Sequence, residues 1–170
     1  NGEMIKQIIK VFNQFPKFKD CCKINILEKS ENLKKIQKQK LKKNNIKWLK
    51  NLNEINDVPS IFVANEFFDA LPIKQFIKKK NKWFERNVKF SELNKPEFID
   101  ILSNIKKIEK KIGFKIFHGQ KFVEYSPLSI KYLKVISKKI NINAGGILII
   151  DYGYWDRKMK NTIKSISNHR

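Results

Sequence analysis

Short apolar runs alternate with amphipathic stretches along this 170-residue chain. Most of the runs are continuous rather than alternating, which is typical of parallel strands that are buried on both faces. The stretches between them have helical spacing of their apolar residues. This order predicts an α/β fold built on a mostly parallel sheet. Strands are expected at 24–27, 46–49, 61–64, 121–125 and 147–150, and helices at 3–15, 30–43 and 127–140.

The helix expected over 30–43 has two further signals in its sequence. Ser30 precedes it and is a suitable N-cap, because its hydroxyl can accept a hydrogen bond from a backbone amide of the first turn. Leu33, Ile36 and Leu41 recur at helical spacing. We expect these three side chains to face the core.

The middle of the chain departs from the strand-and-helix alternation. Two segments that alternate apolar and polar residues flank a lysine-rich tip, which predicts a hairpin over 73–88. A helix is expected over 96–112, with Pro96 in its first turn. We therefore expect residues 73–120 to form an insertion, a hairpin plus a helix, within a single domain of residues 1–170.

Basic side chains outnumber acidic ones 37 to 16, which gives a net charge of +21. Such a charge is common in nucleic-acid-binding proteins, and this function stays open as an alternative. However, the chain has 34 Lys, 26 Ile and 18 Asn but only three Arg. This skew is typical of an AT-rich coding sequence, whereas phosphate-binding surfaces favour Arg. Because the lysines are spread along the chain, we interpret them as solvated surface, with nucleic-acid binding the less favoured function.

The cysteines and histidines exclude several kinds of site. Cys21 and Cys22 are adjacent, which argues for a reducing compartment and against a disulfide scaffold. His118 and His169 lie far apart without metal-ligand spacing, so no metal site is expected. No apolar run approaches the ~20 residues that a membrane-spanning helix needs.

Three of the expected parallel strands are followed or closed by an acid, namely Glu28, Glu66 and Asp151. Ligands of doubly wound sheets bind outside the carboxyl ends of the strands, so these acids predict a site on one rim. An acid after the second strand of a nucleotide-binding βαβ unit accepts hydrogen bonds from ribose hydroxyls. Glu28 matches that position, and a solvent-exposed acid without a ligand is the alternative.

Glu66 and Asp69 are three residues apart in an aromatic run. On a helical turn, both carboxylates would share one face. They could then hold a cation such as a guanidinium and later take up its proton. The alternative is structural, with Asp69 capping a short helix and Glu66 pairing with a lysine. Phe67 and Phe68 are expected to pack in the core rather than contact a ligand.

The run from Ala64 to Pro72, A-N-E-F-F-D-A-L-P, followed by Gln75-Phe76, resembles the signature of the MidA-like methyltransferases. Three later segments resemble further motifs of that family in the same order: E-Y-S-P at 124–127, G-G-I-L-I-I-D-Y-G at 145–153, and N-T-I at 161–163 with the stretch to His169-Arg170. The family's glycine-rich loop is represented only by Asn1-Gly2. The strand before that loop and everything after Arg170 are absent, so a fragment truncated at both ends is expected.

The resemblance implies a Rossmann-like class I methyltransferase fold with S-adenosylmethionine as the methyl donor. It also implies a protein arginine as the acceptor, because the family includes the mitochondrial arginine methyltransferase that acts in respiratory complex I assembly. A complex I subunit is therefore the implied partner. The implied compartment is the cytoplasm of a bacterium or the mitochondrial matrix of a eukaryote. A member of the same fold that has lost methyl transfer and serves as an assembly factor is a further alternative.

Carried onto this sequence, the resemblance also implies roles for individual residues. Gly2 would let the backbone approach the methionine part of the cofactor, Glu28 would hold the ribose, and Asn51 follows the third family strand, where many members have an acid. Asn65 lies where the next strand opens onto the methyl donor. The predicted cofactor-binding residues are Gly2, Glu28, Asn51, Asn65 and Asp151, the predicted catalytic residues are Asn65, Glu66 and Asp69, and Tyr152 is expected to line the pocket beside Asp151.

Overall fold

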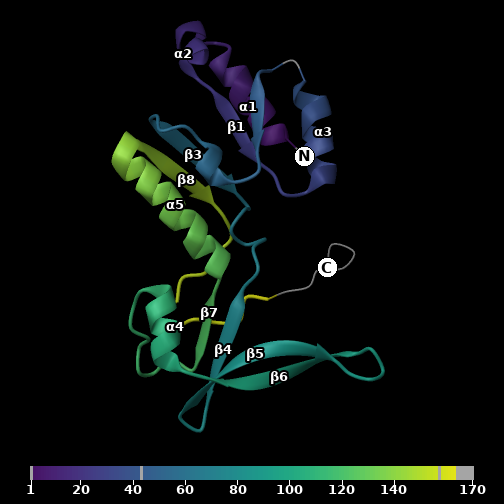
Figure 1. Cartoon of the computed structure of the whole chain (residues 1–170), viewed down its shortest axis with the longest axis vertical. Coiled ribbons are helices and arrows are strands. Elements are labelled where there is room, and N and C mark those ends of the chain that lie inside the picture. The colour runs from purple at the N-terminus through teal and green to yellow at the C-terminus, as the bar shows by residue number, and fades with distance from the viewer. Residues whose placement is uncertain (1, 43, 157, 164–170) are drawn as a thin grey trace. The chain divides into compact units, whose positions relative to one another are not determined.

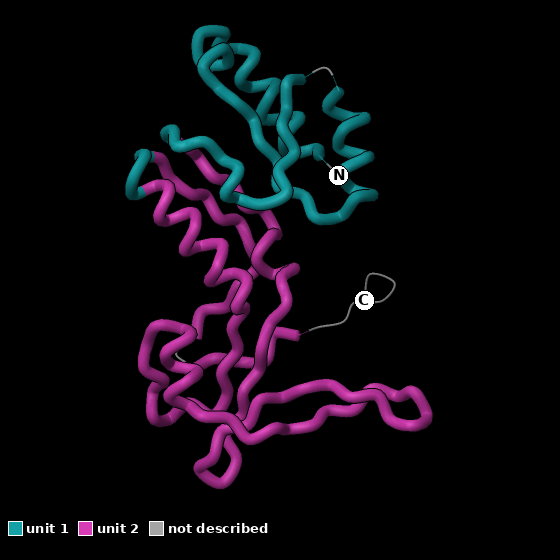
Figure 2. The backbone as a smooth tube through the Cα atoms, viewed as in Figure 1, with its two compact units in different colours: residues 1–59, 141–144 teal, residues 60–140, 145–170 magenta. Residues whose placement is uncertain are grey.

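The computed structural model describes residues 2–42, 44–156 and 158–163 (Figure 1). The chain forms two compact units, which Figure 2 distinguishes by colour. Unit 1 comprises residues 1–59 and 141–144, and unit 2 comprises residues 60–140 and 145–170. Each unit combines helices with a pair of parallel strands, which confirms the α/β class.

Unit 1 is built around one βαβ connection. Strands β1 and β2 pair in parallel, with Ile24 opposite Ile46, and helix α3 connects them. The helices of the unit are α1 (Glu3–Phe12), α2 (Pro16–Cys21) and α3 (Glu31–Leu41), its strands are β1 (Ile24–Leu27) and β2 (Ile46–Leu49), and a 3-10 turn spans Leu52–Glu54. The helix predicted for 3–15 therefore ends at Phe12, and α2 was not predicted.

Helix α3 has the predicted N-cap but a different buried side. The Ser30 hydroxyl accepts a hydrogen bond from the backbone amide of Leu33 at 3.3 Å. Gln37 and Leu41 are buried, whereas Leu33 and Ile36 are 39% and 48% exposed. The expectation that Leu33 and Ile36 face the core is therefore wrong. The buried face of α3 includes Gln37, a polar residue that the spacing of apolar residues alone could not identify.

Unit 2 contains a parallel strand pair and a four-stranded antiparallel sheet. The strands β3 and β8 pair in parallel, and the antiparallel sheet has the order β6-β5-β4-β7. The strands are β3 (Ser60–Asn65), β4 (Lys74–Lys79), β5 (Lys82–Phe90), β6 (Pro96–Ser103), β7 (Phe122–Tyr125) and β8 (Gly145–Ile150). Helix α4 spans Ile105–Ile112, and helix α5 runs from Pro127 to Asn143. Two of the five strand pairings among the described residues are parallel, so the mostly parallel sheet is found only in part.

The hairpin predicted in the middle of the chain is formed by β4 and β5. Lys80 and Asn81 connect these strands with φ angles of 45° and 61°. Two consecutive residues in the left-handed region are typical of a type I′ turn, whose twist matches that of a two-stranded ribbon. Asn tolerates this conformation better than most residues do.

The helix predicted for 96–112 is wrong over its first half. Residues Pro96–Ser103 form strand β6, which pairs with β5 along its whole length, and α4 begins only at Ile105. The apolar residues between 98 and 102 fit both the helical and the strand spacing. The long β5 strand pairs with this segment, and the pairing favours a strand. Pro96 lies at the first position of an edge strand, where its missing N–H is tolerated.

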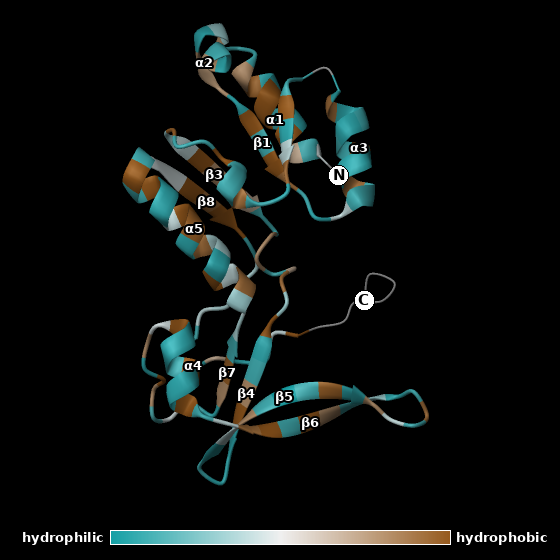
Figure 3. Cartoon of the chain, in the orientation of Figure 1, coloured by the Kyte–Doolittle hydropathy of each residue, from teal (hydrophilic) through white to brown (hydrophobic). Residues whose placement is uncertain are grey.

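The core of unit 2 lies between the antiparallel sheet and α4. Its buried members are Phe76, Trp83, Ile108 and Val123. The apolar strands β3 and β8 (Figure 3) are covered less completely. Ile61 is 77% exposed and Leu148 is 54% exposed. Alternate side chains of a strand point to opposite faces, so the expected burial on both faces is wrong for this pair as described.

Among the described residues, no helix has both the length and the apolar character needed to cross a bilayer.

The start of β8 allows a test of the parallel pairing. Gly145 has a φ of +130°, and a Cβ atom there would lie 1.9 Å from the backbone oxygen of Ser60. Gly145→Ala must therefore displace β3 from β8 or distort the backbone. We expect it to lower the free energy of unfolding by more than about 2 kcal/mol in urea denaturation.

Gly146→Ala is the matched control for this substitution, because a Cβ atom at Gly146 meets nothing within 4 Å. We expect its free energy of unfolding to stay within about 0.5 kcal/mol of that of the unsubstituted protein. Equal stability of the two variants would contradict the described register.

Candidate active site

The carboxyl ends of β3 and β8 lie at one edge of unit 2. Asn65 at the end of β3 is opposite Ile150 at the end of β8. The backbone amide of Glu66 donates to the carbonyl oxygen of Ile150 at 2.8 Å, which extends the pairing by one residue. Asn65, Glu66 and Asp151 therefore share this rim, as their positions at strand ends predicted.

The carboxylate of Asp151 anchors the turn that follows β3. One of its oxygens accepts hydrogen bonds from the backbone amides of Phe68 at 3.1 Å and Asp69 at 3.2 Å. The other accepts a hydrogen bond from the amide of Tyr152 at 2.8 Å. Hydrogen bonds to a charged acceptor are among the stronger ones in proteins. Asp151 therefore holds the segment of Glu66 to Asp69 against the end of β8.

The segment that carries Glu66 and Asp69 is a turn rather than a helix. Glu66 itself has a φ of 46°, in the left-handed region that a non-glycine residue adopts rarely and often at functional sites. The helical spacing that would place both acids on one face therefore does not apply. The rings of Phe67 and Phe68 lie 5.2 Å apart, and Phe67 also contacts Tyr132 of α5. Both side chains are half-buried and lie outside the buried core cluster, so the expectation that they pack in the core is met only in part.

Both acids of this turn remain available to a ligand. Glu66 and Asp69 are exposed. No described residue forms an ion pair with either carboxylate. The structural alternative, with Glu66 paired to a lysine and Asp69 capping a helix, is thus not found in the part of the chain that the structure describes.

A polar network around the buried side chain of Gln75 joins three motifs that are far apart in the sequence. The side-chain amide of Gln75, which is 4% exposed, donates to Glu124 at 2.6 Å and to Asn161 at 2.7 Å. The hydroxyl of Thr162 donates to the other oxygen of Glu124. These residues were not predicted as site residues. Their places in the signature, in the E-Y-S-P segment and in the N-T-I segment were the signal that could have singled them out.

In unit 1, Glu28 belongs to a second polar network. Its carboxylate accepts hydrogen bonds from the backbone amide of Ser30 and from the side chain of Gln37, each at 2.9 Å. The indole N–H of Trp48 donates to the Gln37 side-chain oxygen at 3.1 Å. A carboxylate has about four acceptor positions, so Glu28 keeps room for two further donors. Gln37 was missed, although a polar residue between Leu33 and Leu41 on one helix stripe is an available signal.

Gly2 lies beside the same network and Asn51 lies outside it. Gly2 has a φ of +84°, and a Cβ atom there would lie 3.4 Å from the Gln37 side chain. Asn51 caps the 3-10 turn, where its side-chain oxygen accepts from the amide of Asn53 and its amide donates to Glu54. The structure thus brings Gly2 and Glu28 together around Gln37 and gives Asn51 a local structural task.

No group of three or more His, Cys, Asp or Glu side chains suited to a metal ion occurs among the residues that the structure describes. Cys21 and Cys22 are free thiols. His169, like Asn1 and Arg170, lies outside the described residues.

A family model described as "Putative S-adenosyl-L-methionine-dependent methyltransferase" matches residues 1–170 of this chain. Among curated proteins, the mitochondrial protein arginine methyltransferase NDUFAF7 of Xenopus laevis is 24% identical over 181 residues, which cover 92% of this chain and 41% of that protein. The homolog of Caenorhabditis elegans is 30% identical over 128 residues, covering 74% of this chain and 30% of the relative. For the human protein the identity is 24% over 196 residues, with coverages of 99% and 43%. The chain therefore spans less than half the length of these relatives.

Two solved structures from Burkholderia thailandensis share the fold. Both are COG1565 superfamily proteins with a TM-score of 0.57, at 22% and 20% identity. Each match covers 78% of this chain and 35% or 36% of the other chain. The first of them is bound to S-adenosyl-homocysteine.

The anchoring by Asp151 can be tested through stability and hydrogen exchange. Asp151→Ala removes the acceptor of three backbone amides, so we expect the free energy of unfolding to fall by about 1–3 kcal/mol. We also expect faster amide exchange at Phe68 and Asp69. Asp20→Ala, which removes an exposed carboxylate from α2, should change stability by less than about 0.5 kcal/mol. Unchanged exchange in Asp151→Ala would contradict the anchoring.

Proposed function

The chain belongs to this family of S-adenosyl-L-methionine-dependent methyltransferases, and we propose that the full-length protein transfers a methyl group from S-adenosylmethionine to an arginine side chain of a protein. The acceptor is inferred from the curated relatives, which are named protein arginine methyltransferases. Because the chain covers less than half of each, the activity is proposed for the whole protein rather than for these 170 residues.

The observation that carries this proposal is the pair of unpaired acids on the anchored turn. A guanidinium is a planar cation that carboxylates hold by charge-assisted hydrogen bonds. Glu66 and Asp69 offer such groups on a turn whose backbone is held by Asp151. A carboxylate there can orient one guanidinium nitrogen and accept its proton as the methyl group is transferred.

The residues of unit 1 fit the cofactor's ribose. Glu28 has free acceptor positions for ribose hydroxyls, and Gln37 fixes the orientation of its carboxylate. Gly2 has no side chain to obstruct an approaching ligand beside Gln37. When bound, S-adenosylmethionine would supply the electrophilic methyl group. We assign Gly2, Glu28, Asn51, Asn65 and Asp151 to the cofactor. The proposed catalytic residues are Asn65, Glu66 and Asp69. The task of Asp151 is to position the turn that carries Glu66 and Asp69.

We also propose that the parallel pairs belong to a Rossmann-like class I fold. The support is that α3 connects β1 to β2 and that α5 precedes β8, which pairs in parallel with β3. On this proposal the chain is one methyltransferase domain, and residues 73–120 are its insertion.

The proposed partner is a subunit of respiratory complex I, and the proposed location in a eukaryote is the mitochondrial matrix. The support is that the curated relatives are named mitochondrial. In a bacterium the same protein would act in the cytoplasm.

Calorimetric titration of the full-length protein with S-adenosylmethionine tests the cofactor. We expect binding, and we expect Glu28→Ala to weaken it at least about tenfold, because two hydrogen bonds to a charged acceptor are lost. Glu92→Ala, which removes an exposed carboxylate between β5 and β6, should bind like the unsubstituted protein. No binding by the unsubstituted protein would sink the proposal, and normal binding by Glu28→Ala would sink only the ribose assignment.

The proposed role of Asp69 toward the acceptor arginine needs a separate assay. We expect Asp69→Asn to lower kcat/KM for methylation of a protein arginine by at least about 100-fold, while the Kd for S-adenosylmethionine changes less than threefold. Asp20→Asn, an exposed substitution of the same chemistry, is the control. Full activity of Asp69→Asn would refute its role. Cofactor binding without methylation of any arginine substrate would favour an assembly factor that has lost catalysis.

A further inference from the structure

Strands β4 and β7 present different chemistry on their two faces. Lys74 pairs with Tyr125 across these strands, and the next pair is Gln75 with Glu124. Consecutive side chains of a strand point to opposite faces. Gln75 and Glu124 therefore form their closed network on one face, while Lys74 and Tyr125 lie on the face that α4 covers.

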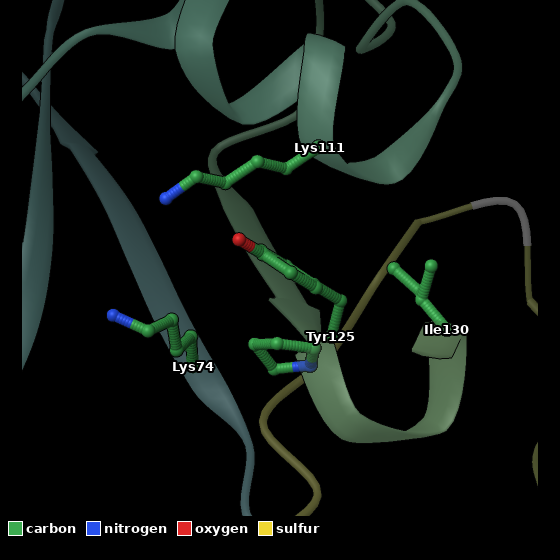
Figure 4. A pocket seen from close by; sticks show the side chains of 5 residues that line it. Lys74, Lys111, Tyr125 and Ile130 are labelled. Carbon is green, nitrogen blue, oxygen red and sulfur yellow. The ribbon is translucent and has the colours of Figure 1, made fainter. Parts of the chain in front are cut away.

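Beside Lys74 and Tyr125 there is a cavity of about 250 Å³. It is lined by Lys74, Lys111, Tyr125, Pro127 and Ile130 (Figure 4). One end of the lining is polar, because the Tyr125 hydroxyl and the Nζ atoms of both lysines point away from Ile130. The other end is apolar. The volume of the whole cavity is below the roughly 300 Å³ at which pockets for drug-sized ligands begin, so the cavity suits a small group.

The Tyr125 hydroxyl is a donor without a partner. Its oxygen is buried and makes no hydrogen bond to any described residue. The ring is held in place by stacking on Phe76, with centroids 5.9 Å apart and planes 8° from parallel. Burial raises the pKa of Tyr125, so the phenol remains a proton donor at neutral pH. Buried polar groups usually have a partner, and those without one call for an explanation such as a ligand.

The charge around the cavity is positive. Lys74 forms an ion pair with Glu85. Lys111 on α4 is exposed, and no described residue forms a hydrogen bond or an ion pair with it. Two ammonium groups and one carboxylate leave a net charge of +1 beside an unmet hydroxyl donor. A cation would be repelled, whereas an anion would be attracted to this positive charge.

We propose that this cavity binds a small anionic group, a carboxylate or a phosphate, with a short apolar body against Pro127 and Ile130. The anion would lie between the ammonium groups of Lys74 and Lys111 and accept a hydrogen bond from the Tyr125 hydroxyl. The apolar body explains why the cavity extends past its polar end. The site is independent of the proposed methyl transfer, because none of its five lining residues is assigned to that reaction.

The test is isothermal titration calorimetry of the full-length protein, with inorganic phosphate, butyrate and butyramide as separate probes. Butyramide has nearly the shape of butyrate without its charge. We expect butyrate or phosphate to bind, and butyramide to bind at least about tenfold more weakly than butyrate. A lower Kd for butyrate identifies carboxylates as the ligand class, and a lower Kd for phosphate identifies phosphoryl groups. Binding of neither anion, or equal binding of butyrate and butyramide, overturns the proposal.

Two substitutions locate the binding. Lys111→Met keeps most of the length of the side chain and removes its charge, and Tyr125→Phe keeps the ring stacked on Phe76 and removes only the hydroxyl. Each should raise the Kd of the anion about tenfold. Lys110→Met, on an exposed position of the same helix that does not line the cavity, should leave the Kd unchanged. An unchanged Kd in both Lys111→Met and Tyr125→Phe overturns the proposal even if anions bind elsewhere. Because these tests use no S-adenosylmethionine, failure here and failure of the proposed methyl transfer are separate results.

Discussion

The carboxylate of Asp151 is the constraint on which the candidate active site of unit 2 depends. The turn after β3 has a left-handed residue at Glu66 and no regular structure of its own, so its backbone amides need acceptors from elsewhere in the protein. Asp151 supplies them at the end of the neighbouring strand. One acid is thereby used for structure, and Glu66 and Asp69 are left exposed for chemistry. In the sequence, Glu66, Asp69 and Asp151 are three acids of similar kind, and only the hydrogen bonds distinguish their tasks.

Polar side chains buried inside each unit serve the same purpose of fixing orientation. Gln75 bridges Glu124 and Asn161 in unit 2, and Gln37 bridges Glu28 and Trp48 in unit 1. An amide can do this because it donates and accepts at once, so it can satisfy a carboxylate on one side and a donor or a second acceptor on the other. A buried carboxylate without such a partner would be costly to keep charged.

Sequence reasoning succeeded where the signal is local. The strands β1, β2, β3 and β8 lie within a residue or two of their predicted bounds, Ser30 caps α3, and the hairpin turns at Lys80 and Asn81. It failed where the structure of a segment depends on a partner from another part of the chain. Residues 96–103 became a strand because β5 extends far enough to pair with them. The shared rim of Asn65, Glu66 and Asp151 could be predicted because topology places the ends of paired parallel strands together. Gln37 and Gln75 were missed, because their partners are separated from them by 9 to 86 residues and only their places on the α3 stripe and in the signature pointed to them.

Strand β7 contains a residue of the family motif on one face and a separate polar group on the other. The family resemblance draws attention to Glu124, whose network with Gln75 is closed and already satisfied. One step along each strand, the alternation of side chains turns Lys74 and Tyr125 to the other face, where the hydroxyl of Tyr125 has no partner among the described residues. The stacking on Phe76 ties that ring to the core, so the hydroxyl cannot easily turn out to water. A donor held in this way stabilises an anion better than a mobile hydroxyl would, since the hydroxyl does not have to be ordered when the anion arrives.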